Sequence, residues 1–357
     1  MTLKLLLETD KCIHCGSCTS VCPLLNAGLK GDPQKNGPDA LKDTERVKYL
    51  TNLPFNCTLC LACQEVCPVN VPIPRVVEHL RGKVKAPESI EQMIENIKRS
   101  ENIFGLKSEE RWMWTFELDV TLEERIDVKA DIGYFTGCNS AFSPLLSKIL
   151  TSHISLLERA NVNYTLLSEE ACCGFPLVIA GRRELVAPLA EKNIENFKKK
   201  GVKKVITSCP ACLRSWREIY PKIKEVPFEV QHTTQFLWQL VKEGKLKVAK
   251  TKEAFVYQDP CELARGCHIV EEPRKLIKET GAKLLEFQDK KLEATCCGGG
   301  GLLRATNVQA ASRIALLKLQ EAKRLGAKAI ITACPACMQN FVKAGGRMQV
   351  LDVSEIL

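Results

Sequence analysis

Two six-residue stretches, Thr207-Ser-Cys-Pro-Ala-Cys212 and Thr332-Ala-Cys-Pro-Ala-Cys337, decide the fold of this chain. They lie 125 residues apart, and each begins at the last residue of a strand-like run, 202–207 or 327–332. Because proline is best tolerated in the first turn of a helix, each stretch predicts a strand, a cysteine and then a helix. The first cysteine of each stretch then lies near a helix N-terminus, where the helix dipole favours thiolate over thiol.

The cysteines around these stretches repeat as well. Each copy has a single cysteine, a Cys-Cys-Gly triplet and the Cys-Pro-Ala-Cys motif. The matched cysteines are Cys138, Cys172, Cys173, Cys209 and Cys212 in the first copy and Cys261, Cys296, Cys297, Cys334 and Cys337 in the second. Their offsets of 123, 124, 124, 125 and 125 residues keep the copies in register. The tails match too, with His232-Thr-Thr-Gln-Phe-Leu in one copy and Asp352-Val-Ser-Glu-Ile-Leu in the other. A period this long indicates a duplicated domain.

Hydrophobic periodicity alternates within each copy. Strand-like runs lie at 131–136, 162–167 and 202–207, and again at 254–257, 283–287 and 327–332. Helical spacing covers 143–160, 182–200 and 307–325. Strands that alternate with helices predict small α/β layers with mostly parallel sheets. Because such sheets present ligands at their strand ends, we expect all three cysteine groups of a copy to lie there.

The N-terminal part carries a different cysteine pattern. Cys12-x-x-Cys15-x-x-Cys18-x-x-x-Cys22-Pro23 is followed by Cys57-x-x-Cys60-x-x-Cys63-x-x-x-Cys67-Pro68. This is the bacterial ferredoxin run, present twice, in which the fourth cysteine of each run ligates the other cluster. The pattern predicts an α-helical, ferredoxin-like domain with two cubane [4Fe–4S] clusters. We assign Cys12, Cys15, Cys18 and Cys67 to one cluster and Cys57, Cys60, Cys63 and Cys22 to the other.

Two other uses of the thiols stay open at this point. Zinc takes four ligands, usually from two Cys-x-x-Cys pairs, whereas each front run is a triple with a trailing Cys-Pro and each repeat offers five thiols. A thioredoxin-like site explains Cys-Pro-Ala-Cys after a strand, but it uses only two of the five thiols in each copy. Five sulfurs in three places favour a polynuclear iron–sulfur cluster.

The distribution of cysteines also predicts the domain order. None occurs between Cys67 and Cys138, which indicates a connector between the ferredoxin-like part and the repeats. The predicted units are a ferredoxin-like domain (1–85), a helical connector (86–130), a first repeat (131–250) and a second repeat (251–357).

Within the connector, Pro87 and Glu88 predict a helix start, and Ile90, Met93, Ile94 and Ile97 follow at helical spacing. Trp112 and Trp114 then form an aromatic cluster. They either attach the front domain to the repeats or flank a cofactor path.

Composition narrows the function classes. Of the 357 residues 45% are apolar and 26% charged, as in a folded globular protein. The net charge of +9 is spread along the chain without a basic block, which argues against nucleic acid as a partner. No run of 18 apolar residues occurs, and the Leu-rich start (1–10) is too short for a secretory signal. We therefore expect a reducing, cytoplasmic location, in which 19 cysteines indicate metal binding rather than disulfides.

Seven motifs carry a family resemblance. They are Tyr134-Phe-Thr-Gly-Cys138, Cys172-Cys-Gly-Phe-Pro176, Thr207–Cys212, Asp259-Pro-Cys261, Glu271-Glu-Pro-Arg274, Cys296-Cys-Gly-Gly-Gly-Gly301 and Thr332–Cys337. With them, residues 8 to 357 resemble the CCG-domain iron–sulfur oxidoreductases, such as the D subunit of heterodisulfide reductase. The iron–sulfur subunits of glycolate oxidase and of the glycerol-3-phosphate and lactate dehydrogenases are similar as well. The fold class expected is multidomain, α+β with α/β: an α-helical ferredoxin-like domain followed by two duplicated α/β CCG domains.

The resemblance also implies cofactors and a function. In heterodisulfide reductase two CCG modules hold non-cubane [4Fe–4S] clusters at a shared cavity, where a disulfide is split. Here the five cysteines of each copy would hold one such cluster, and no protein side chain is assigned a catalytic role. The expected function is electron relay through two cubane clusters to the paired CCG clusters, which reduce a disulfide. The alternative is an electron conduit from a flavin-dependent glycolate, lactate or glycerol-3-phosphate dehydrogenase to a quinone or cytochrome.

Either function implies a redox partner subunit: a flavoprotein, a cytochrome b or a hydrogenase-type protein. No Gly-x-Gly-x-x-Gly fingerprint occurs, so flavin and NAD would come from such a partner. Contact with the inner face of the cell membrane would also be made through the partner.

The second copy departs from the family pattern at one motif. Where His-Asp-Pro-Cys-His is common, this chain has Gln258-Asp-Pro-Cys261-Glu262, a change that bears on the substrate CoM-S-S-CoB rather than on the cluster. Cys267 has no counterpart in the first copy and is expected to be a free structural thiol. His14 and His79 are expected in packing or solvent roles. Arg265 and Arg304 either neutralise an anionic substrate or lie on the plain surface.

Overall fold

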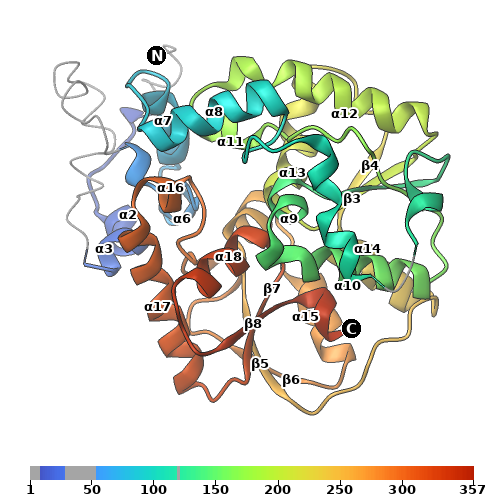
Figure 1. Cartoon of the computed structure of the whole chain (residues 1–357). Helices are drawn as coiled ribbons and strands as arrows, with labels where there is room; N and C mark the ends of the chain where they lie inside the picture. Colours follow the sequence, from blue (N-terminus) through green and yellow to red (C-terminus); the bar gives the residue numbers. More distant parts are fainter. Residues whose placement is uncertain (1–8, 29–53, 119–120) are drawn as a thin grey trace.

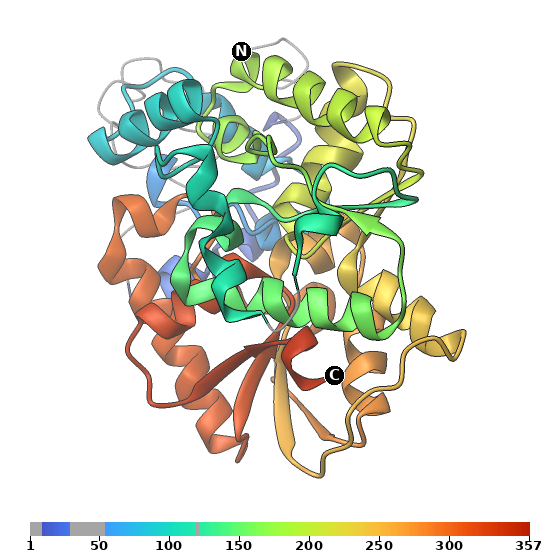
Figure 2. The same cartoon turned by 45° about the vertical axis from the view of Figure 1, so that its right-hand side comes forward.

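The chain folds into two similar α/β modules with the ferredoxin-like segment beside them. The computed structural model describes residues 9–28, 54–118 and 121–357, so most of the Leu-rich start lies outside the described part. In Figure 1 the N-terminal segment (blue) lies at the left, the first repeat (green to yellow) at the upper right and the second repeat (orange to red) at the bottom. The second sheet is seen more openly in Figure 2.

Each repeat is built on a four-stranded parallel sheet with the same strand order. The order is β2-β1-β3-β4 in the first repeat and β6-β5-β7-β8 in the second. The strands are β1 (Ile132–Phe135), β2 (Tyr164–Thr165), β3 (Lys204–Thr207), β4 (Glu229–His232), β5 (Ala254–Gln258), β6 (Lys283–Glu286), β7 (Ala329–Thr332) and β8 (Gln349–Asp352). The six predicted strands are confirmed, although β2 keeps only the two residues that pair with β1. Strands β4 and β8 end at His232 and Asp352, the first residues of the matched tails, and are short, half-polar strands that periodicity did not reveal.

The helices follow the predicted alternation. In the first repeat they are α9 (Cys138–Phe142), η5 (Pro144–Leu146), α10 (Ser147–Arg159), α11 (Phe175–Ile179), η6 (Arg183–Leu185), α12 (Ala187–Lys199), α13 (Pro210–Arg214), η7 (Ser215–Ile219), η8 (Tyr220–Lys222) and α14 (Thr233–Lys242). In the second they are η9 (Glu262–Gly266), α15 (Glu271–Glu279), η10 (Lys291–Glu293), α16 (Leu303–Thr306), α17 (Val308–Arg324), α18 (Pro335–Lys343) and η11 (Val353–Ile356). As predicted, α13 and α18 begin at the prolines of the two six-residue stretches, with Cys209 and Cys334 at the preceding position.

The described part of the front segment and connector is helical. Its elements are α2 (Ser17–Ser20), α3 (Pro23–Asn26), η2 (Pro54–Asn56), α6 (Ala62–Glu65), α7 (Ile73–Arg81), α8 (Glu88–Ser100), η3 (Ser108–Glu117) and η4 (Glu123–Arg125). Helix α8 starts where predicted and buries Ile90, Ile94 and Ile97. The 3-10 helix η3 packs against α9 and α10 of the first repeat with Trp114 buried, so this tryptophan attaches the connector to that repeat.

The C-terminal helix of each repeat packs against a helix of the other repeat. Helix α14, which ends the first repeat, packs against α15 of the second, and η11, which ends the second, packs against α10 of the first. Both tail helices start in a capping box: His232 accepts from the Thr234 N–H at 3.2 Å, and Asp352 accepts from the Ser354 N–H at 2.9 Å. The sequence match between the tails thus reflects one docking element used twice.

The core of the first repeat depends on Trp216, which is fully buried among Phe135, Phe197, Tyr220 and Phe228. We predict that Trp216→Ala destabilises the protein by about 3–5 kcal/mol, because it leaves a large cavity among rings that cannot collapse into it. Thermal unfolding followed by circular dichroism under anaerobic conditions measures this. Trp238→Ala, at a half-buried position on α14, is the control with a smaller loss of Tm; equal losses would contradict the prediction.

Candidate functional site

In each repeat two cysteines lie at the point where the strand order of the sheet reverses. The chain runs from β1 outward to β2 and then returns to the other side of β1 as β3. Cys138 follows β1 and Cys209 follows β3, so both lie at the carboxyl ends that border this switch point. Cys261 and Cys334 lie in the same places after β5 and β7. Such switch points form a crevice between the outgoing chain segments, where open α/β sheets bind ligands.

The Cys-Cys pairs do not lie at strand ends, contrary to our expectation. Strand β2 ends at Thr165 and β6 ends at Glu286, well before Cys172 and Cys296. The pairs lie in the long segments that follow these strands. Because the sheet pairing ends early, these segments are free to cross toward the switch point. In the first repeat the connector fixes this path, since the Cys172 N–H donates to the Glu101 carbonyl at 2.7 Å.

These segments bring the five thiols of each copy into one chain of contacts. In the first copy the order is Cys138, Cys172, Cys173, Cys212 and Cys209, with 3.8 Å between the Sγ atoms of Cys138 and Cys172. In the second the order is Cys261, Cys296, Cys297, Cys337 and Cys334, with 3.0 Å between the Sγ atoms of Cys297 and Cys337. The same five-sulfur arrangement therefore occurs twice.

The protonation preferences repeat as well. Hydrogen bonds from the neighbouring thiols lower the pKa of Cys173 and of Cys297, the second cysteine of each pair. Contacts with adjacent thiols raise the pKa of Cys212 and of Cys337. Crowded sulfurs of this kind form a donor set for soft metal ions, because thiolates are the ligands of iron–sulfur clusters.

Both thiol sets face one cavity of about 610 Å³ between the repeats. Four cysteines of each set line it: Cys138, Cys173, Cys209 and Cys212, and the matching Cys261, Cys297, Cys334 and Cys337. The remaining pair, Cys172 and Cys296, is buried outside the lining. The volume suits a small molecule. The duplication therefore produces one shared cavity rather than two separate ones.

Buried carboxylates hold the cysteine segments in place. Glu170 accepts from the Thr136 and Gly137 N–H groups at 2.8 and 2.9 Å, and it pairs with Arg111 of the connector at 2.8 Å. It thereby ties the Cys138 segment to the Cys172 segment. Burial raises the pKa of Glu170, and Arg111 opposes this shift. In the second repeat Asp259 accepts two hydrogen bonds of 2.7 Å from Arg274, just before Cys261.

One contact crosses between the repeats twice, with different chemistry each time. Arg214 at the end of α13 donates to Glu262, the residue after Cys261, at 2.6 Å. At the matched positions, Gln339 of α18 lies 3.5 Å from Asn139, the residue after Cys138. One crossing is thus a partly buried ion pair and the other is a neutral pair of amides. The departure noted at Glu262 has this physical consequence, and Gln258 likewise donates to the Thr295 carbonyl at 3.1 Å, next to Cys296.

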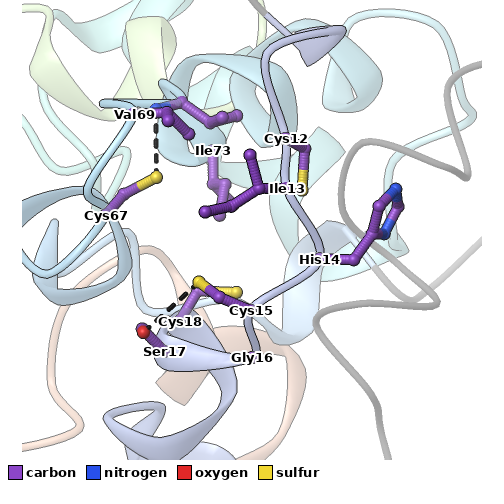
Figure 3. Close-up of a pocket in the computed structure, with 11 residues that line it drawn as sticks. Cys12, Ile13, His14, Cys15, Gly16, Ser17, Cys18, Cys67, Val69 and Ile73 are labelled. Atoms are coloured by element: carbon purple, nitrogen blue, oxygen red, sulfur yellow. Dashed lines mark hydrogen bonds between the residues drawn. The ribbon is translucent and has the colours of Figure 1, made fainter.

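In the front segment, four predicted cysteines line one pocket. They are Cys12, Cys15, Cys18 and Cys67, from the two runs. Figure 3 shows their sulfur atoms around a common space, whereas His14 points away from it. The Val71 N–H donates to the Cys67 sulfur at 3.3 Å, and Ser17 hydrogen bonds lower the pKa of Cys15, which is exposed. Cys67 of the second run therefore lies in the same pocket as three cysteines of the first run.

The other four cysteines of the front segment interact with each other and border the second repeat. Cys22, Cys57, Cys60 and Cys63 influence one another's pKa values, and burial raises that of Cys57 to about 11. Cys60 reaches Cys296 of the second repeat, and hydrogen bonding to Cys296 lowers its pKa. The front segment thus touches the second thiol set directly.

Two features allow this close approach. Gly301 has a φ of +62°, and a Cβ there would lie 2.3 Å from the Thr58 carbonyl carbon, so only glycine fits. Arg265 donates to the Cys60 carbonyl at 2.7 Å and to the Ala294 carbonyl at 2.8 Å. Arg265 therefore has a structural role and does not line the cavity, whereas Arg304 does.

Cys267 and His79, which the sequence also singled out, line neither the shared cavity nor the front pocket. Burial raises the pKa of the Cys267 thiol to about 12. His79 lies on α7, outside the lining of either pocket. Sequence reasoning missed Glu170, Arg111, Arg214, Asn139 and Gln339. The 123–125-residue offsets match Arg214 with Gln339 and Asn139 with Glu262, but they do not show which of these residues are in contact.

Two features are absent from the described residues. Within residues 9–28, 54–118 and 121–357, no group of three or more His, Cys, Asp or Glu side chains is arranged to hold a single metal ion. In the same part of the chain, no helix combines the length and the apolar character that crossing a bilayer requires.

Comparisons with known proteins agree with this organisation. The cysteine-rich domain (CCG) family matches residues 132–216 and 255–341, and the 4Fe-4S dicluster domain family matches 8–71. The D subunit of the dihydromethanophenazine:CoB–CoM heterodisulfide reductase of Methanosarcina acetivorans is 29% identical over 100% of this chain and 94% of its own length. An iron–sulfur protein of Methanocaldococcus jannaschii is 32% identical over 92% of this chain and 67% of its own. The EtfAB:quinone oxidoreductase of Syntrophomonas wolfei is 27% identical over 99% and 58%.

We predict that Cys173→Ser alters only the spectroscopic signal of the iron–sulfur cluster expected at the five thiols of the first repeat. The thiols that contact its sulfur, Cys172 and Cys212, both belong to that set. Electron paramagnetic resonance of the anaerobically purified protein, with iron analysis, measures this. Cys267→Ser serves as the control and leaves every signal unchanged. Uniform loss of all signals in Cys173→Ser would instead assign the residue a general role in folding.

Proposed function

Because this chain belongs to the family of CCG-domain iron–sulfur proteins, we propose that it is a redox subunit that reduces a disulfide in the cavity between its two repeats. The observation that carries the proposal is the arrangement of two matched five-thiol sets around one cavity of about 610 Å³. Two such sets let each half of a disulfide lie beside its own thiol set. A protein that only passes electrons onward needs no such paired cavity.

We assign the clusters by the thiol sets. The two front sets would each hold a cubane [4Fe–4S] cluster, and the two five-thiol sets would each hold a non-cubane one. When bound, these clusters supply electrons one at a time at potentials set by burial and by hydrogen bonds to sulfur. The thiol chemistry fits them, since sulfur donors from separate chain segments converge around the front pocket and around the shared cavity.

The reaction proposed is RS–SR′ + 2e⁻ + 2H⁺ → RSH + R′SH, which breaks the S–S bond and forms two S–H bonds. The electrons come from a redox partner subunit, a flavoprotein, a cytochrome b or a hydrogenase-type protein. Entry through the front segment is supported by two observations: Cys15 is exposed, and Cys60 touches Cys296. The chain's own part is to hold the disulfide between the repeats and to limit its contact with water. We place this reaction in a reducing, cytoplasmic compartment.

Full-length similarity favours disulfide reduction over the hydroxy-acid conduit. Three relatives named as the D subunit of heterodisulfide reductase align over 96–100% of this chain at 28–29% identity. The substrate of those relatives is not transferred to this chain, because Gln258 and Glu262 stand where that family commonly has histidines.

Two measurements on the same anaerobic preparation test the proposal. Iron and sulfide analysis should give about sixteen of each per chain, four for each of four clusters. The protein should then reduce simple disulfides with reduced viologen as donor. About eight irons would leave the five-thiol sets empty and refute the proposal. Full iron loading without reduction of any disulfide would instead favour the conduit.

A further inference from the structure

Some buried side-chain hydroxyl groups of this chain have no hydrogen-bond partner. In the part of the chain that the structure describes, they belong to Thr19, Ser140, Ser215 and Tyr257. Each of these residues lies within four positions of a cysteine that we assign to a thiol set. Burial of an unpaired hydroxyl costs free energy, so such groups are rare in folded proteins and call for an explanation. Their grouping beside the cysteines indicates that sulfur is their common partner.

Ser215 is the most confined of these residues. It is fully buried, and it lies three residues after Cys212, where α13 passes into the π-helical turn η7. A serine in a helix normally satisfies its hydroxyl with water or with the carbonyl oxygen four residues earlier. Ser215 uses neither, because it is closed off from solvent and its hydroxyl forms no bond to a carbonyl. Its hydroxyl proton is therefore available for another acceptor.

The sulfur of Cys173 is an acceptor close to this hydroxyl. Hydrogen bonding to Cys172 and Cys212 lowers the pKa of Cys173, and the Ser215 hydroxyl makes a smaller contribution in the same direction. A hydroxyl has this effect by stabilising the thiolate, which requires that it lie beside the sulfur. Both Cys173 and Ser215 are buried, so bulk water does not compete for the contact. A hydrogen bond in such a place is stronger than one in water.

The second repeat has no hydroxyl at the matched position, which is Asn340. The Asn340 amide donates to the Cys297 carbonyl at 2.7 Å and to the Ala311 carbonyl at 3.0 Å. Its oxygen accepts from Arg304 at 2.9 Å. Because a side-chain amide has two N–H donors, both of them are used on carbonyl oxygens. Asn340 therefore has no donor left for a sulfur.

Backbone groups serve the Cys-Cys pair of the second repeat. The Gly298 N–H donates to the Cys296 sulfur at 3.3 Å, and the Gly299 N–H donates to the Cys297 sulfur at 3.4 Å. A point mutation cannot remove a backbone donor of this kind. The donor beside Cys173, in contrast, is a side chain, so its effect on the first thiol set can be tested by substitution.

We infer that Ser215 donates a hydrogen bond to the Cys173 sulfur and thereby sets the reduction potential of the cluster in the first thiol set. The inference rests on the cluster assignment in the proposed function. A hydrogen bond to sulfur stabilises the reduced cluster more than the oxidised one, because the reduced cluster carries one more negative charge. Ser215 therefore raises the potential of the first cluster and leaves that of the second unchanged. It acts through Cys173, as a positioning residue.

The test is a redox titration of the anaerobic, iron-loaded protein with dithionite and viologen mediators, followed by electron paramagnetic resonance. The signal of the first set is the one that Cys173→Ser alters. In Ser215→Ala the reduced-to-oxidised ratio of this cluster at a fixed potential should fall about tenfold, the effect of one hydrogen bond to a charged group. For a one-electron couple this is a downward shift of about 59 mV. The potential of the second set should not change.

Two further variants serve as controls. Ser147→Ala removes the same atom from a buried serine of α10, whose hydroxyl donates to the Pro144 carbonyl at 3.0 Å, and should leave both potentials unchanged. Ser215→Thr keeps a hydroxyl and should keep the potential of the first cluster. Electron–nuclear double resonance of the unmodified protein should show, for the first set, a proton coupling that disappears in D₂O. Ser215→Ala should lack this coupling.

The outcomes separate this inference from the proposed function. With about sixteen irons per chain, an unchanged first potential in Ser215→Ala overturns the inference, and so does an equal shift of both potentials, which would indicate a packing role. The absence of an exchangeable proton coupling in the unmodified protein overturns it without any variant. About eight irons per chain would refute the cluster assignment, and with it the proposed function.

Discussion

The structure depends on the crevice that a parallel sheet opens where its strand order reverses. In both repeats the central pair of strands ends at this crevice, and a cysteine follows each of them. The Cys-Cys pair also lies near this crevice, but the outer strand that precedes it ends several residues earlier, so an irregular segment makes the connection. Two buried ion pairs, Glu170 with Arg111 and Asp259 with Arg274, fix the cysteine segments in position. Their desolvation is offset because each makes several hydrogen bonds to segments that would otherwise separate.

Duplication turns two such crevices into one cavity. The tails exchange docking positions, α14 on α15 and η11 on α10, so each repeat completes the packing of the other. Because the exchange is reciprocal, it sets the two switch points facing each other. The contacts between the repeats occur at matched positions, but the side chains that make them differ in charge. Arg214 and Glu262 form an ion pair where Gln339 and Asn139 form a neutral contact.

The front segment packs closely against the second repeat. Backbone approaches backbone at Gly301 and Thr58, and Arg265 spans from the Cys60 carbonyl to the Ala294 carbonyl. Arg81, fully buried, donates to the Cys57 carbonyl at 2.8 Å and to the Ile179 carbonyl of the first repeat at 2.7 Å. Buried guanidinium groups suit this task because each presents several donors in a fixed plane. The contact between Cys60 and Cys296 depends on these anchors.

Sequence alone determined what repeats locally: the cysteine motifs and their offsets, the strand–cysteine–helix order at both Cys-Pro-Ala-Cys stretches, the α8 start at Pro87 and Glu88, and the ferredoxin-like runs. These follow from short-range chemistry, such as the fixed φ of proline and the period of apolar residues. Only the tertiary structure decided which residues meet across the repeats. The detour of the Cys-Cys segments, the strands β4 and β8, and the partners Arg214 and Glu262 or Arg304 and Asn340 depend on packing between distant segments. No local pattern encodes such contacts, because the side chains that meet lie far apart in the sequence.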